Sequence, residues 1–277
     1  MTFRWLYPFA ALAMLFGLLV AVAQPASGAP AGPVALDAAC AASLVASTTQ
    51  GDDLQVLGCD PAGRGLAVVA VGDPTTARSV AVIVPGSDMD LHTIAKPLSW
   101  ARALRAASGP GTAVVVWIGY TTPQGLGIDA ASGALARAGA PALDSFVDGL
   151  RAPHVTVVAH SYGTVVAALA APRLDADDLV LLGSPGVRTD DVADLHTRAH
   201  VFAARADTDW MTWVPSIEIG DLGHGTDPTS SSFGATLLPT TGVTTHDGYL
   251  TPGTASLAAV AVVASSGVDA GAAANPL

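Results

Sequence analysis

The chain is poor in basic residues, in aromatic residues and in cysteine. Lysine and arginine together number 12 against 23 aspartates and glutamates, so the formal net charge of the 277 residues is −11. Nucleic acids are bound through many contacts between basic side chains and phosphates. An acidic chain whose single lysine is Lys96 is therefore not expected to have a nucleic-acid partner.

The two cysteines, Cys40 and Cys59, lie close together in the sequence. Two isolated cysteines are too few for a zinc site. In an oxidising compartment such a pair forms a disulfide, and two buried thiols are the alternative. We expect a Cys40–Cys59 disulfide.

The first residues have the pattern of a secretory signal peptide. Arg4 precedes an apolar run over residues 9–22, and Ala21-Val22-Ala23 is a small-residue cleavage pattern. A transmembrane anchor is the competing interpretation, but the run is short for a bilayer span. We expect cleavage after Ala23 and a bacterial protein that is secreted or associated with the cell envelope, with no membrane span after cleavage.

The remaining chain alternates between apolar β-rich runs and helical stretches, which is typical of a doubly wound, mostly parallel sheet in a single α/β domain. The expected strands cover residues 66–71, 79–84, 113–119, 155–160, 179–182 and 200–204, and the expected helices cover residues 100–107, 140–150, 164–171 and 255–263. The Gly- and Ala-rich stretch 120–139 follows a strand end and is expected to be a lid or substrate-binding loop. We expect a signal peptide over 1–23, an N-terminal segment with the disulfide over 24–63, the domain over 64–264 and a flexible tail over 265–277.

A β-branched run in residues 155–166 breaks at Ala159-His160-Ser161-Tyr162-Gly163 and continues as an apolar helix pattern. A strand-to-helix turn of this kind presents a nucleophilic serine, and it requires small residues two places before and after it. Ala159 and Gly163 meet that requirement. Ser161 is therefore the candidate nucleophile, and a simple helix-capping serine is the alternative.

An acid and a histidine follow the serine in the chain, in the order Ser, Asp, His that α/β-hydrolases use. The strand over 200–204 leads into a loop with two acids, of which Asp209 is preferred and Asp207 stays open. His246, just before a turn and the final helix, is the candidate base. His224 is its rival and, failing that role, a pocket residue.

The five other histidines are expected to be surface or satisfied core residues: His92, His154, His160, His196 and His200. His160 precedes the nucleophile, and the period of two along a strand should turn its side chain away from Ser161. Acyl transfer also needs donors for the oxyanion, and the backbone N–H groups of Tyr162 and Ser87 are the candidates. Asp88, Asp90 and His92 form only a weak metal pattern, so no metal and no cofactor are expected.

Several of these motifs together resemble an actinobacterial family of secreted α/β-hydrolases catalogued as a domain of unknown function. The matching segments are Pro85-Gly86-Ser87, the Ser161 pentapeptide, Gly183-Ser184-Pro185-Gly186, Asp209-Trp210, His224 to Pro228 and His246 to Tyr249. The resemblance implies an α/β-hydrolase fold and a triad of Ser161, Asp209 and His246. It implies no substrate.

The sequence thus predicts a secreted serine hydrolase that cleaves a carboxylic ester of a small molecule or lipid through an acyl-enzyme. Amide or thioester cleavage would use the same residues. The alternative from another class is a non-catalytic exported binding protein on the same scaffold.

Overall fold

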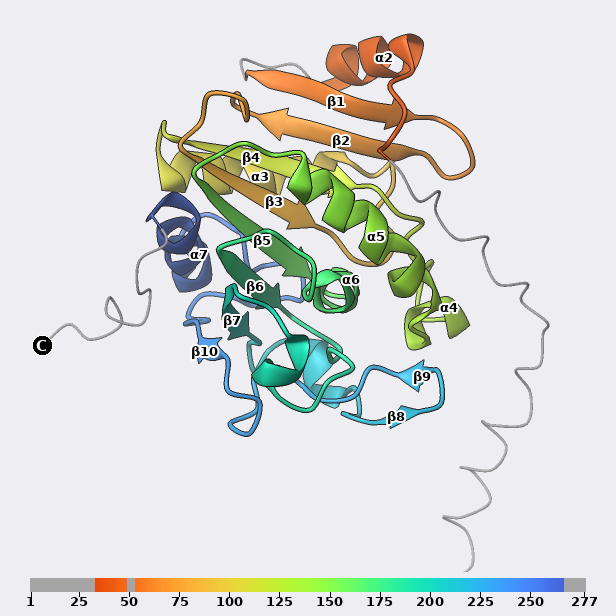
Figure 1. Ribbon diagram of the computed structural model, residues 1–277, viewed down its shortest axis with the longest axis vertical. Helices are drawn as coiled ribbons and strands as arrows, with labels where there is room; N and C mark the ends of the chain where they lie inside the picture. Colours follow the sequence, from red (N-terminus) through yellow and green to blue (C-terminus); the bar gives the residue numbers. More distant parts are fainter. Residues whose placement is uncertain (1–32, 49–52, 267–277) are drawn as a thin grey trace, which may run out of the picture.

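The computed structural model describes residues 33–48 and 53–266, and the expected signal peptide 1–23 lies outside them. Its centre is an eight-stranded sheet in the order β1-β2-β4-β3-β5-β6-β7-β10 (Figure 1). The strands are β1 (Leu54–Asp60), β2 (Leu66–Val71), β3 (Ser79–Val84), β4 (Thr112–Ile118), β5 (His154–His160), β6 (Asp178–Leu182), β7 (His200–Ala204) and β10 (Thr236–Leu237). Within this sheet the β1–β2 and β2–β4 pairs are antiparallel and the other pairs are parallel. The predicted doubly wound, mostly parallel sheet is confirmed.

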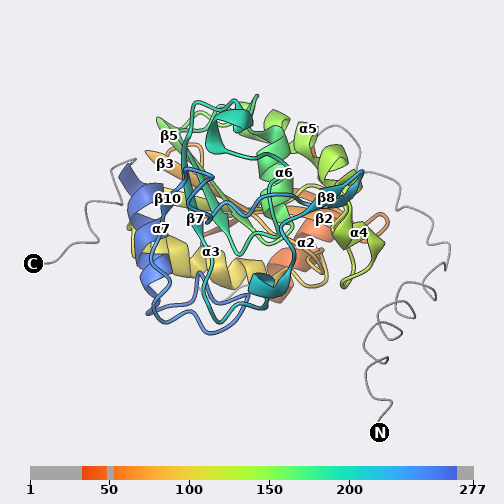
Figure 2. The same cartoon turned by 90° about the horizontal axis from the view of Figure 1, so that it is seen from below.

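Helices cover both faces of the sheet. They are α2 (Ala38–Thr48), α3 (Ala95–Ser108), α4 (Ile128–Ala131), α5 (Ala134–Asp148), α6 (Gly163–Ala170) and α7 (Ala255–Ser266), with 3₁₀ turns η1 (Val192–Leu195) and η2 (Trp210–Trp213). In Figure 2, α2, α3 and α7 lie on one side of the sheet and α5 and α6 on the other. A separate hairpin of β8 (Glu218–Ile219) and β9 (Leu222–Gly223) lies beside α4.

The central strands form because their side chains are buried on both faces, as in other parallel sheets covered by helices. Every residue of β3 is buried. Val80, Val82 and Val84 pack into the core under α5 and α6, while Ala81 and Ile83 pack into the core under α3 and α7. The parallel pairing of β3, β5, β6 and β7 places their carboxyl ends at one edge, where ligands bind in such sheets.

The fold begins earlier than the sequence predicts. The sheet includes β1, which lies in the segment 24–63 expected to precede the domain. The strand pattern there is weak because β1 is an edge strand with several half-buried residues. The predicted Cys40–Cys59 disulfide is present and joins α2 to β1. At the other end, α7 continues to Ser266, and the rest of the expected tail lies outside the described residues.

In the expected loop 120–139, the structure has α4 and the start of α5. Across the described ranges, 33–48 and 53–266, we find no helix with the length and apolarity that a bilayer span requires.

Candidate active site

Ser161 lies on a tight turn between β5 and α6. Its φ of +56° is in the left-handed region that residues other than glycine rarely adopt. Its N–H donates to the Leu182 carbonyl at 2.9 Å, which ties the turn to β6. A Cβ atom at Gly163 would lie 2.2 Å from the Val84 carbonyl oxygen, so only glycine fits where the helix approaches β3. The first residue before α6 is Tyr162, and no side chain caps the helix, which disfavours a capping role for Ser161.

Asp209 and His246 are held together by hydrogen bonds, although they are far apart in the sequence. His246 Nδ1 lies 2.9 Å from both carboxylate oxygens of Asp209. The side chain of Asp209 is fully buried at the start of η2, where its Oδ1 accepts from the Met211 N–H at 2.9 Å. Because Nδ1 donates to the acid, the Nε2 atom of neutral His246 carries the free lone pair.

Tyr249 completes the set of donors around the acid. Its hydroxyl donates to Asp209 Oδ2 at 2.6 Å and accepts from the Ala206 N–H at 3.0 Å. Burial alone would raise the pKa of Asp209, but the hydrogen bonds from His246, Tyr249 and Met211 outweigh it and lower that pKa. Asp209 is therefore an ionised acceptor. Asp207, the other candidate acid, is exposed to solvent.

Gly183, which follows β6, makes room for this pair. Its φ is +54°, and a Cβ atom there would lie 2.9 Å from Asp209 Oδ2 and 3.2 Å from His246 Cε1. Any larger residue would displace the acid or the imidazole. The sequence motif around Gly183 contributes to the family resemblance, but nothing in one sequence indicates which loop this glycine faces.

Ser161 and His246 line the same cavity. His246 Nε2 is buried and has no hydrogen-bond partner among the described residues. The structure does not contain a hydrogen bond between Ser161 and His246. Such bonds are often long in free hydrolases and tighten when substrate binds.

His224 also lines the cavity but has different partners. Its Nε2 donates to the Ala130 carbonyl at 2.8 Å, and its backbone carbonyl accepts from the Arg188 N–H at 2.7 Å. Burial lowers its pKa, and no carboxylate is hydrogen-bonded to its ring. The glycines beside it suggest a loosely held loop, yet the residue is only 3% exposed and held on both sides.

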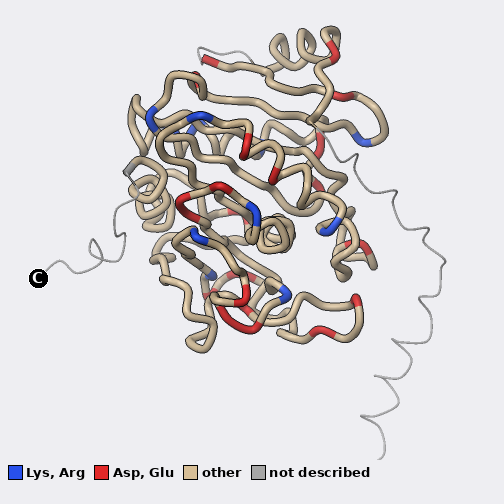
Figure 3. The backbone as a smooth tube through the Cα atoms, in the orientation of Figure 1, with Lys and Arg blue, Asp and Glu red and all other residues tan. Residues whose placement is uncertain are grey.

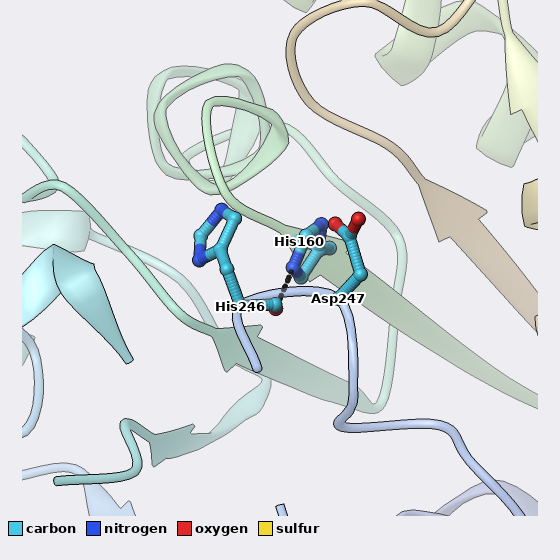
Figure 4. Close-up of side chains that lie close together, drawn as sticks. All are labelled: His160, His246 and Asp247. Carbon is cyan, nitrogen blue, oxygen red and sulfur yellow. Dashed lines mark hydrogen bonds between the residues drawn. The ribbon is translucent and has the colours of Figure 1, made fainter. Parts of the chain in front are cut away.

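His160 is more closely involved than the sequence predicts. Its ring is buried, lines the cavity and lies 4.7 Å from the ring of His246, centroid to centroid. Its Nε2 donates to the His246 backbone carbonyl at 2.8 Å (Figure 4). Burial lowers the pKa of His160 to about 4, so the ring is neutral at physiological pH. The period of two predicts a side chain turned away from Ser161, yet both residues line the cavity. The period cannot indicate that the His246 loop lies beside His160.

Asp247 lies on the other side of His160 (Figure 4). His160, His246 and Asp247 are the one group of three potential metal ligands in the described part of the chain. Asp209 already occupies Nδ1 of His246, and Lys96 forms an ion pair with Asp247 at 2.5 Å. The ammonium group would repel a cation, so the cluster does not fit a metal centre. Asp88 and Asp90 instead accept hydrogen bonds from loop backbone N–H groups, and His92 is exposed.

The loop after β3 approaches the serine. A Cβ atom at Gly86 would lie 2.7 Å from Ser161 Cβ and 2.8 Å from the Tyr162 nitrogen. Within residues 33–48 and 53–266, the backbone N–H groups of Tyr162 and Ser87 have no hydrogen-bond acceptor. Both residues line the cavity, which has a volume of about 670 Å³. Two free donors beside a serine are what an oxyanion site requires.

The comparisons with known proteins agree with this fold. A family model described as alpha/beta hydrolase matches residues 60–219. An uncharacterized protein of Mycobacterium tuberculosis H37Rv is 34% identical over 253 residues, and the match covers 75% of this chain and 38% of the relative. An uncharacterized protein of Mycobacterium bovis is 34% identical over 140 residues, covering 44% of this chain and 52% of the relative. The chain thus spans about 40 to 50% of the length of these relatives.

Solved structures with a similar fold include a serine hydrolase of Xanthomonas campestris, described as without lid, at 20% identity and a TM-score of 0.46. That match covers 82% of this chain and 99% of the other. Carboxyl esterase 2 of Tuber melanosporum is 10% identical with a TM-score of 0.48, covering 83% and 97%.

The strand order and the turn after β5 define an α/β-hydrolase fold. The chain belongs to the α/β-hydrolase family. The narrower actinobacterial family that its motifs resemble stays a prediction.

Proposed function

We propose that the protein is an exported serine hydrolase that cleaves carboxylic esters. Ser161 is the nucleophile, His246 the general base and Asp209 the acid that orients the imidazole. The observation that carries the proposal is that Ser161, on its strained turn, lines one cavity with His246, whose imidazole is hydrogen-bonded to the buried Asp209. Strain of this kind is retained where the surrounding structure and the function require it.

The proposed mechanism follows from the proton positions. His246 Nε2 takes the proton of the Ser161 hydroxyl as its oxygen attacks the ester carbonyl, and the N–H groups of Tyr162 and Ser87 stabilise the oxyanion. His246 then gives the proton to the leaving alcohol, and water hydrolyses the acyl-enzyme in the same way. Ionised Asp209 stabilises the imidazolium in both steps.

Export is part of the proposal. Its support is the leader pattern in the sequence and the Cys40–Cys59 disulfide, since disulfides persist in oxidising compartments. Edman sequencing of the protein recovered from the culture medium or the cell envelope tests it, with Gln24 expected as the first residue.

Fluorophosphonate labelling tests the nucleophile. We expect rapid labelling of the wild type and none of Ser161→Ala, which should also lose on the order of 10⁴ to 10⁶ in kcat on p-nitrophenyl esters with the fold intact. A folded wild type that neither labels nor turns over any ester would favour the non-catalytic binding protein.

The choice of base is tested by a matched pair of histidine variants. His246→Ala should lose both labelling and turnover because it removes the imidazole that is bonded to Asp209. His224→Ala should keep labelling and change mainly KM, since this ring lines the cavity without a carboxylate partner. The reverse result would assign the base to His224.

A further inference from the structure

The cavity beside Ser161 has an apolar side formed by segments far apart in the sequence. Leu126 and Ala130 come from the α4 region, Val214 and Ile217 from the chain after η2, and Ile219 and Leu222 from the β8–β9 hairpin. A backbone bridge between Ser132 and Leu222 joins the α4 region to the hairpin. In Figure 2 these two elements lie next to each other. A volume of about 670 Å³ is within the range of pockets that enclose drug-sized ligands.

The apolar surface continues outside the cavity. Large apolar side chains that line it are also strongly exposed: Leu126 by 77%, Ile217 by 54%, Ile219 by 73% and Leu222 by 49%. Single exposed apolar residues are ordinary, but a contiguous group around one opening indicates a binding surface. We call these four residues the apolar rim.

The two acidic groups of the hairpin, Glu218 and Asp221, are already paired with arginines from outside it. Arg188 is 7% exposed and bonds to Glu218 Oε1 at 2.6 Å, Asp221 Oδ1 at 3.2 Å and the Gly223 carbonyl at 2.7 Å. Arg137 forms a second ion pair with Asp221 at 2.8 Å. Figure 3 shows the acidic positions on this hairpin with basic positions nearby. The ion pairs attach the hairpin to the rest of the domain, while its Ile219 and Leu222 stay exposed.

We propose that the cavity and the apolar rim bind the acyl chain of the substrate, so that the enzyme hydrolyses esters of long-chain fatty acids. The chain carbons near the carbonyl lie in the cavity, and the distal carbons lie along the rim. This inference rests on the proposed ester hydrolysis at Ser161. The continuity of the rim with that serine favours an acyl chain over a protein partner.

The first test is the dependence of kcat/KM on chain length. We measure p-nitrophenyl acetate, butyrate, octanoate and dodecanoate below the concentrations at which they aggregate. Full burial of each methylene corresponds to about a fourfold gain. We expect a rise of at least tenfold from butyrate to octanoate. Turnover of acetate with no gain at longer chains overturns the acyl-chain site and leaves the proposed hydrolysis standing.

The second test uses variants of the cavity and the rim. Ala130→Phe, which fills the apolar side, should lower the ratio of kcat/KM for octanoate to that for acetate at least tenfold. Ala134→Phe on the exposed start of α5, outside the cavity lining, is the matched control. Ile219→Ser should lower the ratio of kcat/KM for dodecanoate to that for octanoate by about threefold or more, whereas Leu237→Ser, at an exposed position of β10 outside the cavity lining, should not.

Two further outcomes separate the possibilities. If the wild type is a dimer that Ile219→Ser converts to a monomer with an unchanged chain-length profile, the rim is an interface between copies and the proposal is overturned. If no ester is hydrolysed at all, calorimetric titration of Ser161→Ala with sodium octanoate still tests the site. If octanoate binds to Ser161→Ala but not to the double variant Ser161→Ala/Ala130→Phe, the acyl-chain site is supported. If octanoate does not bind to Ser161→Ala, the site is refuted.

Discussion

Two residues that have no role in the proposed reaction steps, Gly183 and Tyr249, allow the candidate site to form. Gly183 and Tyr249 surround the Asp209 carboxylate, one by leaving space and the other by donating a hydrogen bond. A buried carboxylate needs such partners to stay ionised, because burial alone favours its protonated form. The position of the Asp209 carboxylate therefore depends on Gly183, just after β6, and on Tyr249, in the loop before α7.

We expect Gly183→Ala to impair the site beyond its effect on stability. The left-handed backbone costs alanine about 1–2 kcal/mol, and its methyl group would meet Asp209 and His246. Gly63→Ala is the matched control, because Gly63 has a φ of +62° and nothing within 4 Å of a Cβ atom. Gly183→Ala should lose more stability in urea than Gly63→Ala because of these contacts, and under conditions where both variants are folded only Gly183→Ala should lose at least tenfold in kcat. Equal activity in the two variants would refute the close packing at Gly183.

Asp209→Asn should reduce kcat by roughly 10² to 10⁴, because a neutral amide cannot hold the imidazole in the productive tautomer. Asp207→Asn should have little effect, since this side chain is exposed. Steady-state rates of the two variants on one p-nitrophenyl ester decide between the acids. A larger loss in Asp207→Asn would transfer the role of the acid to Asp207.

At the scale of elements, His154 links three of them at the end of the sheet opposite the site. Its Nε2 lies 3.0 Å from Asp178 Oδ2 at the start of β6 and 3.1 Å from the Val263 carbonyl of α7. The bond to Asp178 is the largest cause of a raised pKa for His154, and burial opposes it. Protonation of His154 therefore stabilises the packing of β5, β6 and α7.

Stability should depend on pH through this histidine. The pKa of His154 is higher in the folded than in the unfolded state, so its protonation stabilises the fold. This stabilisation is complete below the unfolded-state pKa of about 6.5. It is lost as the pH rises through the folded-state pKa. We expect the Tm of the wild type to exceed that of His154→Gln at low pH, with the gap narrowing toward alkaline pH. His92→Gln, at an exposed loop position, should follow the wild type. A gap that widens with pH would contradict this sign.

At the scale of the whole molecule, the disulfide and the site lie far apart in the sheet. Cys59 is fully buried in the edge strand β1, whereas the site lies at the ends of β3, β5, β6 and β7. The disulfide attaches α2, which has Leu44 as its one buried residue, to that edge. It therefore contributes to stability and not to the geometry around Ser161.

Reduction of the disulfide should lower stability without changing the site. A bridge between residues 19 apart contributes about 3 kcal/mol in the chain-entropy model, or roughly 6–12 °C in Tm for a domain of this size. Dithiothreitol should lower the Tm of the wild type and leave Cys40→Ser unchanged, with fluorophosphonate labelling at 25 °C equal in all samples. Loss of labelling on reduction would show that the disulfide at the edge strand affects the reactivity of Ser161.

Local features of the fold were readable in the sequence. The strands β2, β3, β5, β6 and β7 are continuous apolar runs, and the turn at Ser161 follows from the small residues around it, because both depend on neighbours within a few positions. The edge strand β1 and the short hairpin of β8 and β9 were missed, since their weak patterns form strands only by pairing with distant segments.

The tertiary structure decided how distant loops meet. Asp209 bonds to His246 and not to His224, and His160 holds the His246 backbone, because loops after β5, β7 and β10 converge at one edge of the sheet. The cavity and the apolar rim likewise combine residues from α4, η2 and the hairpin, which no spacing along the chain relates. By itself the sequence determined which residue types are present and their order. Burial and long-range packing, which depend on the whole fold, determined their partners.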